Sequence, residues 1–321
     1  MNLKSILSKR KTQHWPSWDL VYEWENIFSQ IMQLVIKNEK KPFTHRIYIY
    51  LSRIIERYDF SLIFEMSPFQ NNRYENNKNI IPCIIDFFLK DETLPYFIEA
   101  YKNNPIILIS SKEVYEHLIK KEVNKQINIS HLPLSISDKY KINGNTTFKK
   151  KYDLILMGRQ NPVLQEYLNI YIQKHSNFNY VYRILKNDEF MYYSSDGECL
   201  GNINSRDKYM KLMRMGKCGL YATPGIDGGE KRTNGFNQVT PRFLELLACG
   251  CHVIARYKKN PDTDFYEIDK FSDNIDSYEM FERALDHARQ TDVDMSLYSH
   301  YLAKHYTSER VKQLQNLIKD L

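Results

Sequence analysis

Long apolar runs are missing from the sequence, which argues against membrane spans and secretion. No stretch of about 18 uncharged apolar residues, the length that a spanning helix needs, occurs in the chain. The first ten residues carry three basic side chains, and neither an apolar core nor a small-residue cleavage site follows them. We therefore expect a cytoplasmic protein.

Cysteine is scarce, and its spacing fits neither disulfides nor zinc. The five cysteines are odd in number and contain no C-x-x-C pair. Cys83, Cys199 and Cys249 each stand beside an apolar residue, as reduced packing thiols do. We expect reduced thiols and no structural zinc site.

Acidic residues are outnumbered by basic ones. The chain has 39 Asp and Glu against 45 Lys and Arg, which leaves a formal net charge of +6. Such a surface suits nucleic acid, an anionic membrane face or a phosphate-bearing substrate. The short basic runs at residues 9–11 and 149–151 lack the interleaved aromatic residues of a nucleic-acid platform. We therefore expect no nucleic-acid partner and favour a phosphate-bearing substrate or a membrane surface.

Strand-like and helix-like segments alternate along the chain, and its 321 residues suffice for two domains. A domain typically has ~100–200 residues. The apolar runs at 80–86 and 105–110 are typical of strands buried on both faces of a parallel sheet. The strands expected in the first half lie at residues 47–51, 60–64, 80–86 and 105–110, and the helices at residues 20–36, 93–102 and 111–121.

A polar stretch at residues 122–150 separates this series from a second one. Its strands are expected at residues 152–158, 180–185, 218–222 and 251–256, a hairpin at 190–203, and helices from Asn161-Pro162 onward and at 206–215, 241–248, 278–289 and 308–321. The expected divisions are an N-terminal domain at 1–135, a linker at 136–150, a C-terminal domain at 151–300, and a helical segment at 301–321 that can pack back on the first domain. Ligands of such domains bind outside the carboxyl ends of the strands.

Glycine is scarce except in one loop. Four of the 11 glycines lie in residues 223–240, among them Gly225 and Gly235, and the same loop carries Lys231 and Arg232. Glycine allows a close approach of the backbone to a ligand. A strand, this loop and a helix beginning near residue 241 would place free amides and a positive helix end where phosphate can bind. The alternative is a mobile surface loop.

The helix after the loop contains a single acid, Glu245, among apolar neighbours. Arg242 precedes it by three residues, so both side chains lie on one helix face. A carboxylate can accept two ribose hydroxyls, and an arginine can grip a diphosphate. The alternative is an ion pair between Arg242 and Glu245.

Residues 240–255 resemble the C-terminal domain of group 1 glycosyltransferases of the GT-B fold. That family has an R-x-x-E-x-x-A-C-G pattern, which Arg242, Glu245 and Gly250 match here. The resemblance implies an α/β fold of two Rossmann-like domains facing a central cleft, with C-terminal helices. It further implies that Glu245 holds the ribose of a nucleotide-sugar, that Gly250 ends the helix closely, and that the donor segment begins at Asn237 and includes Thr240.

A second match is Gly158-Arg159, where the family's first donor-domain strand ends in Gly-Arg and its Arg contacts the diphosphate. The Lys that follows in the family is absent here. Many members also have an acid eight residues before the ribose-binding Glu, and that position is Asn237. This departure does not support a retaining mechanism, although Asn237 can bond a sugar hydroxyl.

The N-terminal domain is expected to bind the acceptor. Glu65 and Asp86 end two predicted strands and His131 lies in the polar stretch, and each can serve as a general base if its pKa is suitable. The alternative for each is a cap or an ion pair. The D-x-D pairs at residues 262–264 and 292–294 are interpreted as caps or solvated acids. We therefore predict no metal site, and no cofactor besides the donor.

The resemblance implies transfer of a sugar from a nucleotide-diphosphate donor to a saccharide or lipid-linked acceptor. Related proteins build bacterial capsule, lipopolysaccharide or exopolysaccharide, so a peripheral contact with the inner membrane face is expected. The alternatives are another nucleotide-sugar enzyme of this fold, such as an epimerase, and a non-catalytic nucleotide-binding scaffold.

Overall fold

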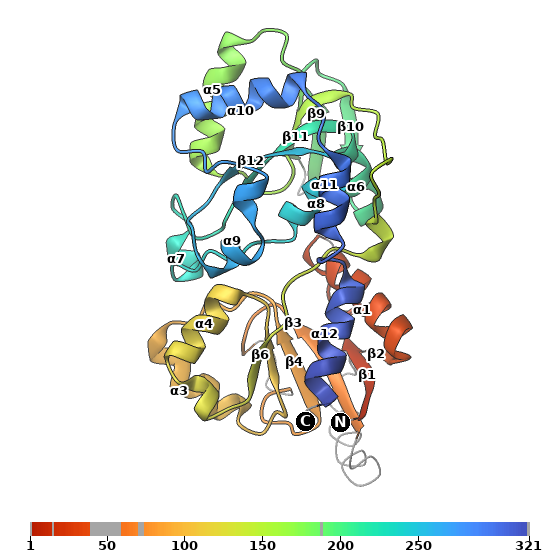
Figure 1. Cartoon of the computed structure of the whole chain (residues 1–321), viewed down its shortest axis with the longest axis vertical. Helices are drawn as coiled ribbons and strands as arrows, with labels where there is room; N and C mark the ends of the chain where they lie inside the picture. The colour runs from red at the N-terminus through yellow and green to blue at the C-terminus, as the bar shows by residue number, and fades with distance from the viewer. Residues whose placement is uncertain (1, 15, 39–58, 70–73, 187–188, 320–321) are drawn as a thin grey trace. The chain divides into compact units, whose positions relative to one another are not determined.

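The computed structural model describes residues 2–14, 16–38, 59–69, 74–186 and 189–319 (Figure 1). The chain divides into two compact units. The first unit comprises Met1–Asp138 and Tyr306–Leu321, and the second comprises Lys139–His305. The strand expected at 47–51 lies outside the described residues. Over the described part of the chain, no helix has both the length and the apolar character needed to cross a membrane.

The first unit is a parallel sheet of six strands in the order β2-β1-β3-β4-β5-β6. Its strands are β1 (Asn2–Ser8), β2 (Val35–Asn38), β3 (Asp59–Glu65), β4 (Ile80–Ile84), β5 (Ile107–Ile109) and β6 (Ile129–His131). Its helices are α1 (Ser17–Met32), α3 (Leu94–Tyr101), α4 (Lys112–Lys120) and α12 (Thr307–Lys319), with 3-10 turns at Asp91–Thr93 and Val123–Lys125; a further 3-10 turn, Asp138–Tyr140, lies where the chain passes into the second unit. Every residue of β4 and β5 is buried, as their apolar runs predict.

Helices α1 and α12 cover one face of this sheet. Their apolar residues share a core with Leu62 and Phe64 of β3, whereas Ile63 points to the other face and packs with Tyr74. The chain passes from β1 to β2 on one side and then to β3 on the other side of β1. The topological switch point of the first unit is therefore at the carboxyl ends of β1 and β3.

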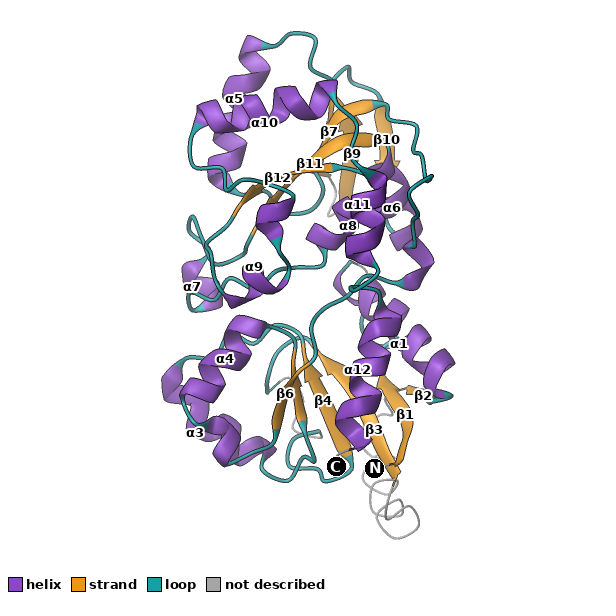
Figure 2. Cartoon of the chain, in the orientation of Figure 1, coloured by secondary structure: helices purple, strands orange, loops and turns teal. Residues whose placement is uncertain are grey.

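The second unit is a mixed sheet in the order β10-β9-β8-β7-β11-β12. Figure 2 draws its strands in orange and its helices in purple. Its strands are β7 (Tyr152–Ile155), β8 (Tyr180–Lys186), β9 (Glu189–Ser194), β10 (Cys199–Asn202), β11 (Gly216–Ala222) and β12 (His252–Arg256). Its helices are α5 (Pro162–Lys174), α6 (Arg206–Arg214), α7 (Glu230–Thr233), α8 (Arg242–Ala248), α9 (Pro261–Phe265), α10 (Tyr278–Gln290) and α11 (Met295–Leu302), with a 3-10 turn at Ile268–Lys270. Strands β7, β8, β11 and β12 are parallel, and β9 and β10 form the expected antiparallel hairpin.

Alternation along β11 places helices on both faces of the second sheet. Cys218 and Leu220 share a core with α5 and α10, whereas Tyr221 packs on Phe243 of α8, with ring centroids 5.7 Å apart. The chain passes from β7 to β8 on one side and later returns to β11 on the other side. The switch point of the second unit is therefore at the carboxyl ends of β7 and β11.

Side-chain caps mark the starts of two helices that the sequence predicts, at 111–121 and from residue 161 onward. Ser111 caps α4, because its side chain accepts a hydrogen bond from the Val114 amide, and Asn161 caps α5 in the same way. The predicted helix at 20–36 is too long: α1 ends at Met32, because Gln33 takes a left-handed conformation (φ 57°). The following residues form β2 instead.

The cysteines form no disulfide, and four of them are buried. Cys199 is exposed on β10, so the prediction that it packs inside is wrong. Strand β10 is the outermost strand of its sheet, which leaves a side chain there open to solvent.

Candidate functional site

The predicted donor residues begin at the switch point of the second unit. Gly158 follows β7 in a left-handed conformation (φ 67°), and a Cβ built there would collide with the Arg242 guanidinium. The Arg242 Nη1 donates a hydrogen bond to the Arg159 carbonyl at 2.9 Å. The first residue of α8 is therefore held against the loop that follows β7. Arg159 contributes its backbone to this contact.

The guanidinium of Arg242 keeps unused hydrogen-bond donors. Its Nε is buried, and no partner for it exists among the described residues. Buried donors are nearly always paired, so an orphan at a switch point indicates a place for a ligand acceptor. An oxyanion is the acceptor that a guanidinium matches best.

The Gly-rich loop at 223–240 is fastened to the sheet. Asp227 accepts two hydrogen bonds from Arg256 at the end of β12, at 2.7 and 3.0 Å, and one from the Asn161 amide at 2.7 Å. The Arg256 guanidinium holds the pKa of Asp227 below its usual value. Because Asn161 also caps α5, Asp227 ties the loop to both neighbouring elements. These contacts disfavour the alternative of a mobile loop.

Asn237 lies inside this loop and is 0% exposed. Its Oδ1 accepts hydrogen bonds from the Thr223 hydroxyl at 3.0 Å and the Gly225 amide at 3.2 Å. Its Nδ2 donates to the Gly235 carbonyl at 2.8 Å. The expectation that the Asn237 side chain bonds a sugar hydroxyl is therefore corrected: its amide forms hydrogen bonds within the loop instead. Gly225 and Gly235 present their backbone groups to Asn237.

The two basic residues of the loop are directed differently from Arg242. Lys231 and Arg232 lie on α7 and are exposed. Neither side chain makes a hydrogen bond or an ion pair with any residue that the structure describes. They are free cations at the surface of the loop, and their predicted phosphate contact stays a prediction.

Glu245 is buried on α8, with an exposed fraction of 3%. Its Oε1 forms an ion pair with Arg206 Nη1 at 2.7 Å, and Arg206 is itself 8% exposed. The alternative of an ion pair with Arg242 is therefore not realised. Arg206 begins α6, and its guanidinium lies over the rings of Tyr140 and Tyr209. Sequence reasoning missed Arg206, because nothing in its local pattern connects α6 with α8.

The remaining donor residues shape the ends of α8. The Thr240 amide donates to the Tyr221 hydroxyl at 3.0 Å, just before the helix. Gly250 follows the helix with φ 61°, and a Cβ there would crowd Phe148 and Met295. The prediction that Gly250 ends the helix closely is confirmed, and its role is in packing.

Three candidate bases lie at the carboxyl edge of the first sheet. Glu65 ends β3, is fully buried, and accepts a hydrogen bond from the Tyr101 hydroxyl at 3.4 Å. Asp86 lies two residues beyond β4 and is partly buried. His131 ends β6, where burial lowers its pKa to about 3. The catalytic roles expected of Glu65, Asp86 and His131 stay predictions.

The acidic D-x-D pairs have different environments. Asp294 caps α11 by accepting the amides of Ser296 and Leu297, as predicted. Asp262 is fully buried within α9, so its interpretation as a cap or a solvated acid is wrong. Within the described ranges, no group of three or more His, Cys, Asp or Glu residues is placed to hold a metal ion.

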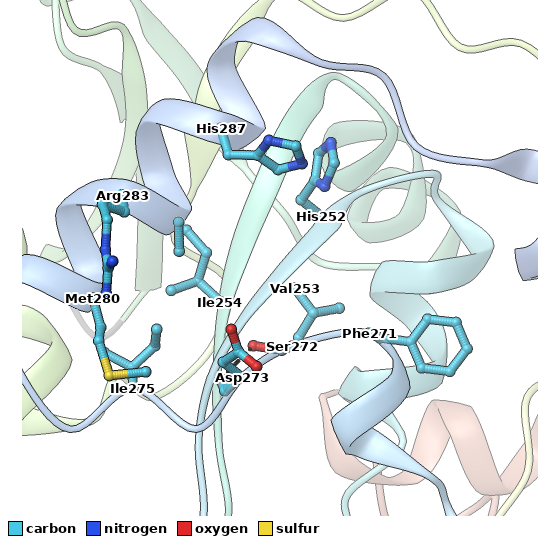
Figure 3. Close-up of a pocket in the computed structure, with 11 residues that line it drawn as sticks. His252, Val253, Ile254, Phe271, Ser272, Asp273, Ile275, Met280, Arg283 and His287 are labelled. Atoms are coloured by element: carbon cyan, nitrogen blue, oxygen red, sulfur yellow. Dashed lines mark hydrogen bonds between the residues drawn. The ribbon is translucent and has the colours of Figure 1, made fainter.

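A separate cavity of about 370 Å³ flanks the edge strand β12 (Figure 3). His252 and His287 lie at one end of it and Met280 at the other, with Arg283 along one side (Figure 3). The His252 Nε2 is 3.0 Å from the Thr291 carbonyl, and burial lowers the pKa of His252. None of the predicted donor residues lines this cavity.

Comparisons with known proteins agree with this geometry in fold. No protein-family model matches the sequence, and no curated protein matches it. A glycosyltransferase from Rickettsia africae superposes with a TM-score of 0.56 at 11% identity, covering 99% of this chain and 98% of that one. A sucrose-phosphate synthase from Thermosynechococcus elongatus gives 0.55 at 10% identity, covering 100% and 99%. An α,α-trehalose-phosphate synthase (UDP-forming) from Burkholderia vietnamiensis gives 0.52 at 8% identity, covering 95% and 84%.

Identities this low establish the architecture alone. The superposed structures span nearly the whole chain and include both parallel-strand units. The chain therefore has the GT-B type of glycosyltransferase fold.

Proposed function

We propose that the chain is a glycosyltransferase that moves a sugar from a nucleotide-diphosphate donor to a saccharide or lipid-linked acceptor. The proposal rests on the Arg242 guanidinium, which is held over Gly158 at the switch point of the second unit and keeps a buried Nε without a protein partner. The fold and the match of residues 240–255 to the family pattern support the same reaction.

The diphosphate is the part of the donor that Arg242 would bind. In sugar transfer the bond between the anomeric carbon and the diphosphate breaks, and negative charge develops on the leaving oxygen. A guanidinium already fixed in place stabilises that charge without reorganising during the reaction. Arg242 is fixed in this sense by its hydrogen bond to the Arg159 carbonyl. Lys231 and Arg232 on the same loop are proposed to add positive charge.

Glu245 is proposed to accept the ribose hydroxyls of the donor. Arg206 pairs with one of its carboxylate oxygens, and a carboxylate offers about four lone-pair sites in all. The ion pair keeps the charge of Glu245 compensated in a buried position, where an isolated carboxylate would be costly. Arg206 is thus a positioning residue for Glu245.

The acceptor hydroxyl attacks the anomeric carbon and gives its proton to a base. Glu65 and Asp86 are the proposed bases, since Glu65 ends β3 and Asp86 lies two residues beyond β4, both at the carboxyl edge of the first sheet. No metal ion or cofactor is included in the proposed reaction, because Arg242 supplies the positive charge for the leaving diphosphate.

The proposed setting is the synthesis of a bacterial surface polysaccharide: capsule, lipopolysaccharide or exopolysaccharide. A cytoplasmic enzyme resting on the inner membrane face would meet lipid-linked acceptors there. The net charge of +6 supports such a contact, because anionic lipids attract basic proteins.

Nucleotide screening by thermal shift tests the donor half of the proposal. We expect one of UDP, GDP, CDP and ADP to stabilise the chain most, by about 2.7 kcal/mol at a hundredfold excess over its Kd. The matching nucleotide-sugars are then assayed for hydrolysis and transfer. Arg242→Gln and Glu245→Ala should each weaken the nucleotide shift, whereas Arg283→Gln, an exposed arginine of the same unit, should leave it unchanged.

Two outcomes separate the alternatives. Nucleotide binding without turnover of any nucleotide-sugar would favour a scaffold over an enzyme. Full donor turnover in Glu245→Ala would refute the assignment of the ribose site.

A further inference from the structure

The first unit has a switch point of its own, and a lysine lies at its edge. Lys9 directly follows β1, and it is only 6% exposed. Its ammonium lies 5.3 Å from the ring centroid of Trp18 in the first turn of α1. Across the described residues, that ammonium makes no hydrogen bond and no ion pair.

Glu25 on α1, the acid that pairs with the neighbouring Arg10, is already committed to other partners. Glu25 is 1% exposed, and its Oε2 accepts hydrogen bonds from Arg10 Nε at 2.9 Å and from the Ser8 hydroxyl at 2.7 Å. Arg10 donates further to the Tyr22 carbonyl at 2.8 Å. Arg10 and Glu25 therefore neutralise each other, and Lys9 is left as the uncompensated charge.

The Lys9 side chain is largely buried, and its ammonium has no anionic partner among the described residues. Charges that folding removes from most of their water are usually paired or bound to a ligand, because desolvation disfavours an isolated charge. The positive N-terminal end of α1 does not by itself attract an anion here, because the Asp19 carboxylate in its first turn already offsets that positive end. The switch point is also where ligands of an open parallel sheet bind.

We propose that Lys9 binds a phosphate group at the switch point of the first unit. An ammonium is a compact point charge that pairs well with phosphate oxygens. Within the proposed function, on which this step rests, the phosphate belongs to the acceptor. The acceptor is then a phosphorylated saccharide, either a soluble sugar phosphate or a saccharide on a polyprenyl phosphate.

Calorimetric titration of the full chain with inorganic phosphate tests the site. Two binding sites are expected, one at Lys9 and one at Arg242. Lys9→Met keeps the apolar stem over Trp18, and it should weaken the first site about tenfold or more, as the loss of a charged hydrogen bond does. Lys4→Met is the matched control, because Lys4 lies on β1, the strand that Lys9 follows, and its side chain is 54% exposed. Arg242→Gln should weaken the second site alone.

Identical phosphate binding by the wild type and Lys9→Met would overturn the proposal. If Lys9→Met does not fold, as judged by circular dichroism, Lys9→Gln is titrated in its place and decides by the same comparison. Lys9→Arg should retain the site, since it restores a cation. Phosphate binding that depends on Lys9 would stand even if no nucleotide bound at Arg242, so the two proposals fail separately.

Competition distinguishes the two sources of the phosphate. Glucose 6-phosphate and a polyprenyl phosphate in detergent micelles are each titrated against bound inorganic phosphate, with glucose and empty micelles as controls. Displacement by the sugar phosphate alone would identify a soluble acceptor. Displacement by the polyprenyl phosphate alone would identify a lipid-linked one. If neither displaces phosphate, the assignment to an acceptor is overturned.

Discussion

The two units use the same kind of sheet edge in different ways. In the second unit, the switch point is enclosed by loops that side chains hold together: Asp227 with Arg256, and Asn237 with its own loop. In the first unit, the corresponding edge carries ionisable residues of separate strands, with Lys9 directly after β1 and Glu65 at the end of β3. The second edge is built as a rigid cradle, and the first as a set of separate charges.

This difference fits the two kinds of partner that a transferase needs. A rigid cradle suits a leaving group whose charge must be stabilised without reorganisation. Separate charged groups suit recognition of an acceptor and removal of its proton. Each of the following variants would weaken one side of this contrast.

The largest effect is expected from removing the partner of Glu245. Arg206→Met leaves a buried carboxylate without compensation, so the second unit should lose about 3–5 kcal/mol of stability. Hydrogen exchange of the β11 amides measures this loss within the second unit. Arg214→Met is the control, because Arg214 lies on the same helix beside Tyr140 and has no carboxylate partner among the described residues.

A double variant separates stability from function. Arg206→Met with Glu245→Leu removes the charge together with its partner, and stability should largely return. Nucleotide binding should stay lost in the double variant. If it returned together with stability, Glu245 would have only a structural role.

The next effect comes from pushing Arg242 out of place without removing its charge. Gly158→Ala adds a Cβ that collides with the guanidinium, so nucleotide affinity should fall about tenfold to a hundredfold. Gly197→Ala is the matched control: Gly197 also has a positive φ (92°), but no atom lies within 4 Å of its Cβ position. Equal affinities in the two variants would argue against Arg242 as the phosphate ligand.

The fold was predictable where burial is continuous along an element. Strands β4 and β5 are entirely buried, and their apolar runs indicated this. Strand β1 was missed, because its inward residues include Ser5 and Ser8, which are buried but polar. A pattern of hydrophobic residues does not detect small polar side chains in a core.

The site was predictable where its residues are close in sequence. Arg242, Glu245 and Gly250 belong to one motif, whereas the pairing of Glu245 with Arg206 joins two helices that are distant along the chain. The burial of Lys9 was equally hidden, since the sequence shows only a basic run. Tertiary contacts decide which charges are compensated, and a local sequence pattern carries no information about those contacts.

A smaller effect is expected from lowering the pH, which should reduce the folding stability of the first unit. Burial, with a contribution from Lys112, lowers the pKa of His131 to about 3, from an ordinary value near 6.5. The unfolded chain then binds more protons than the folded one between these values, so stability falls as the pH drops below about 6.5. The loss should reach roughly 2 kcal/mol at pH 5, at about 1.4 kcal/mol per pH unit.

Hydrogen exchange of the β3 and β11 amides at pH 7 and pH 5 compares the two units directly. The first unit should lose more protection than the second. His131→Gln should flatten this pH dependence, and His14→Gln, an exposed histidine of the same unit, should not. Equal acid sensitivity of both units would contradict the expectation.

The smallest effect tests whether the cradle of the second unit must be rigid. Asp227→Asn weakens the partly buried contact with Arg256 and should cost about 1.5 kcal/mol, the low end for charged hydrogen bonds. Because the pKa of Asp227 is lowered in the folded state, its stabilisation is present above pH ~4 and is lost as the pH falls through the folded pKa. Asp264→Asn, an exposed acid of the same unit, is the control. Amides at 223–240 should exchange faster in Asp227→Asn, and nucleotide affinity should fall with them, because binding must then order the loop. If exchange quickened while affinity stayed the same, the anion site would not depend on a rigid loop, and the contrast between the two sheet edges would lie in their charges alone.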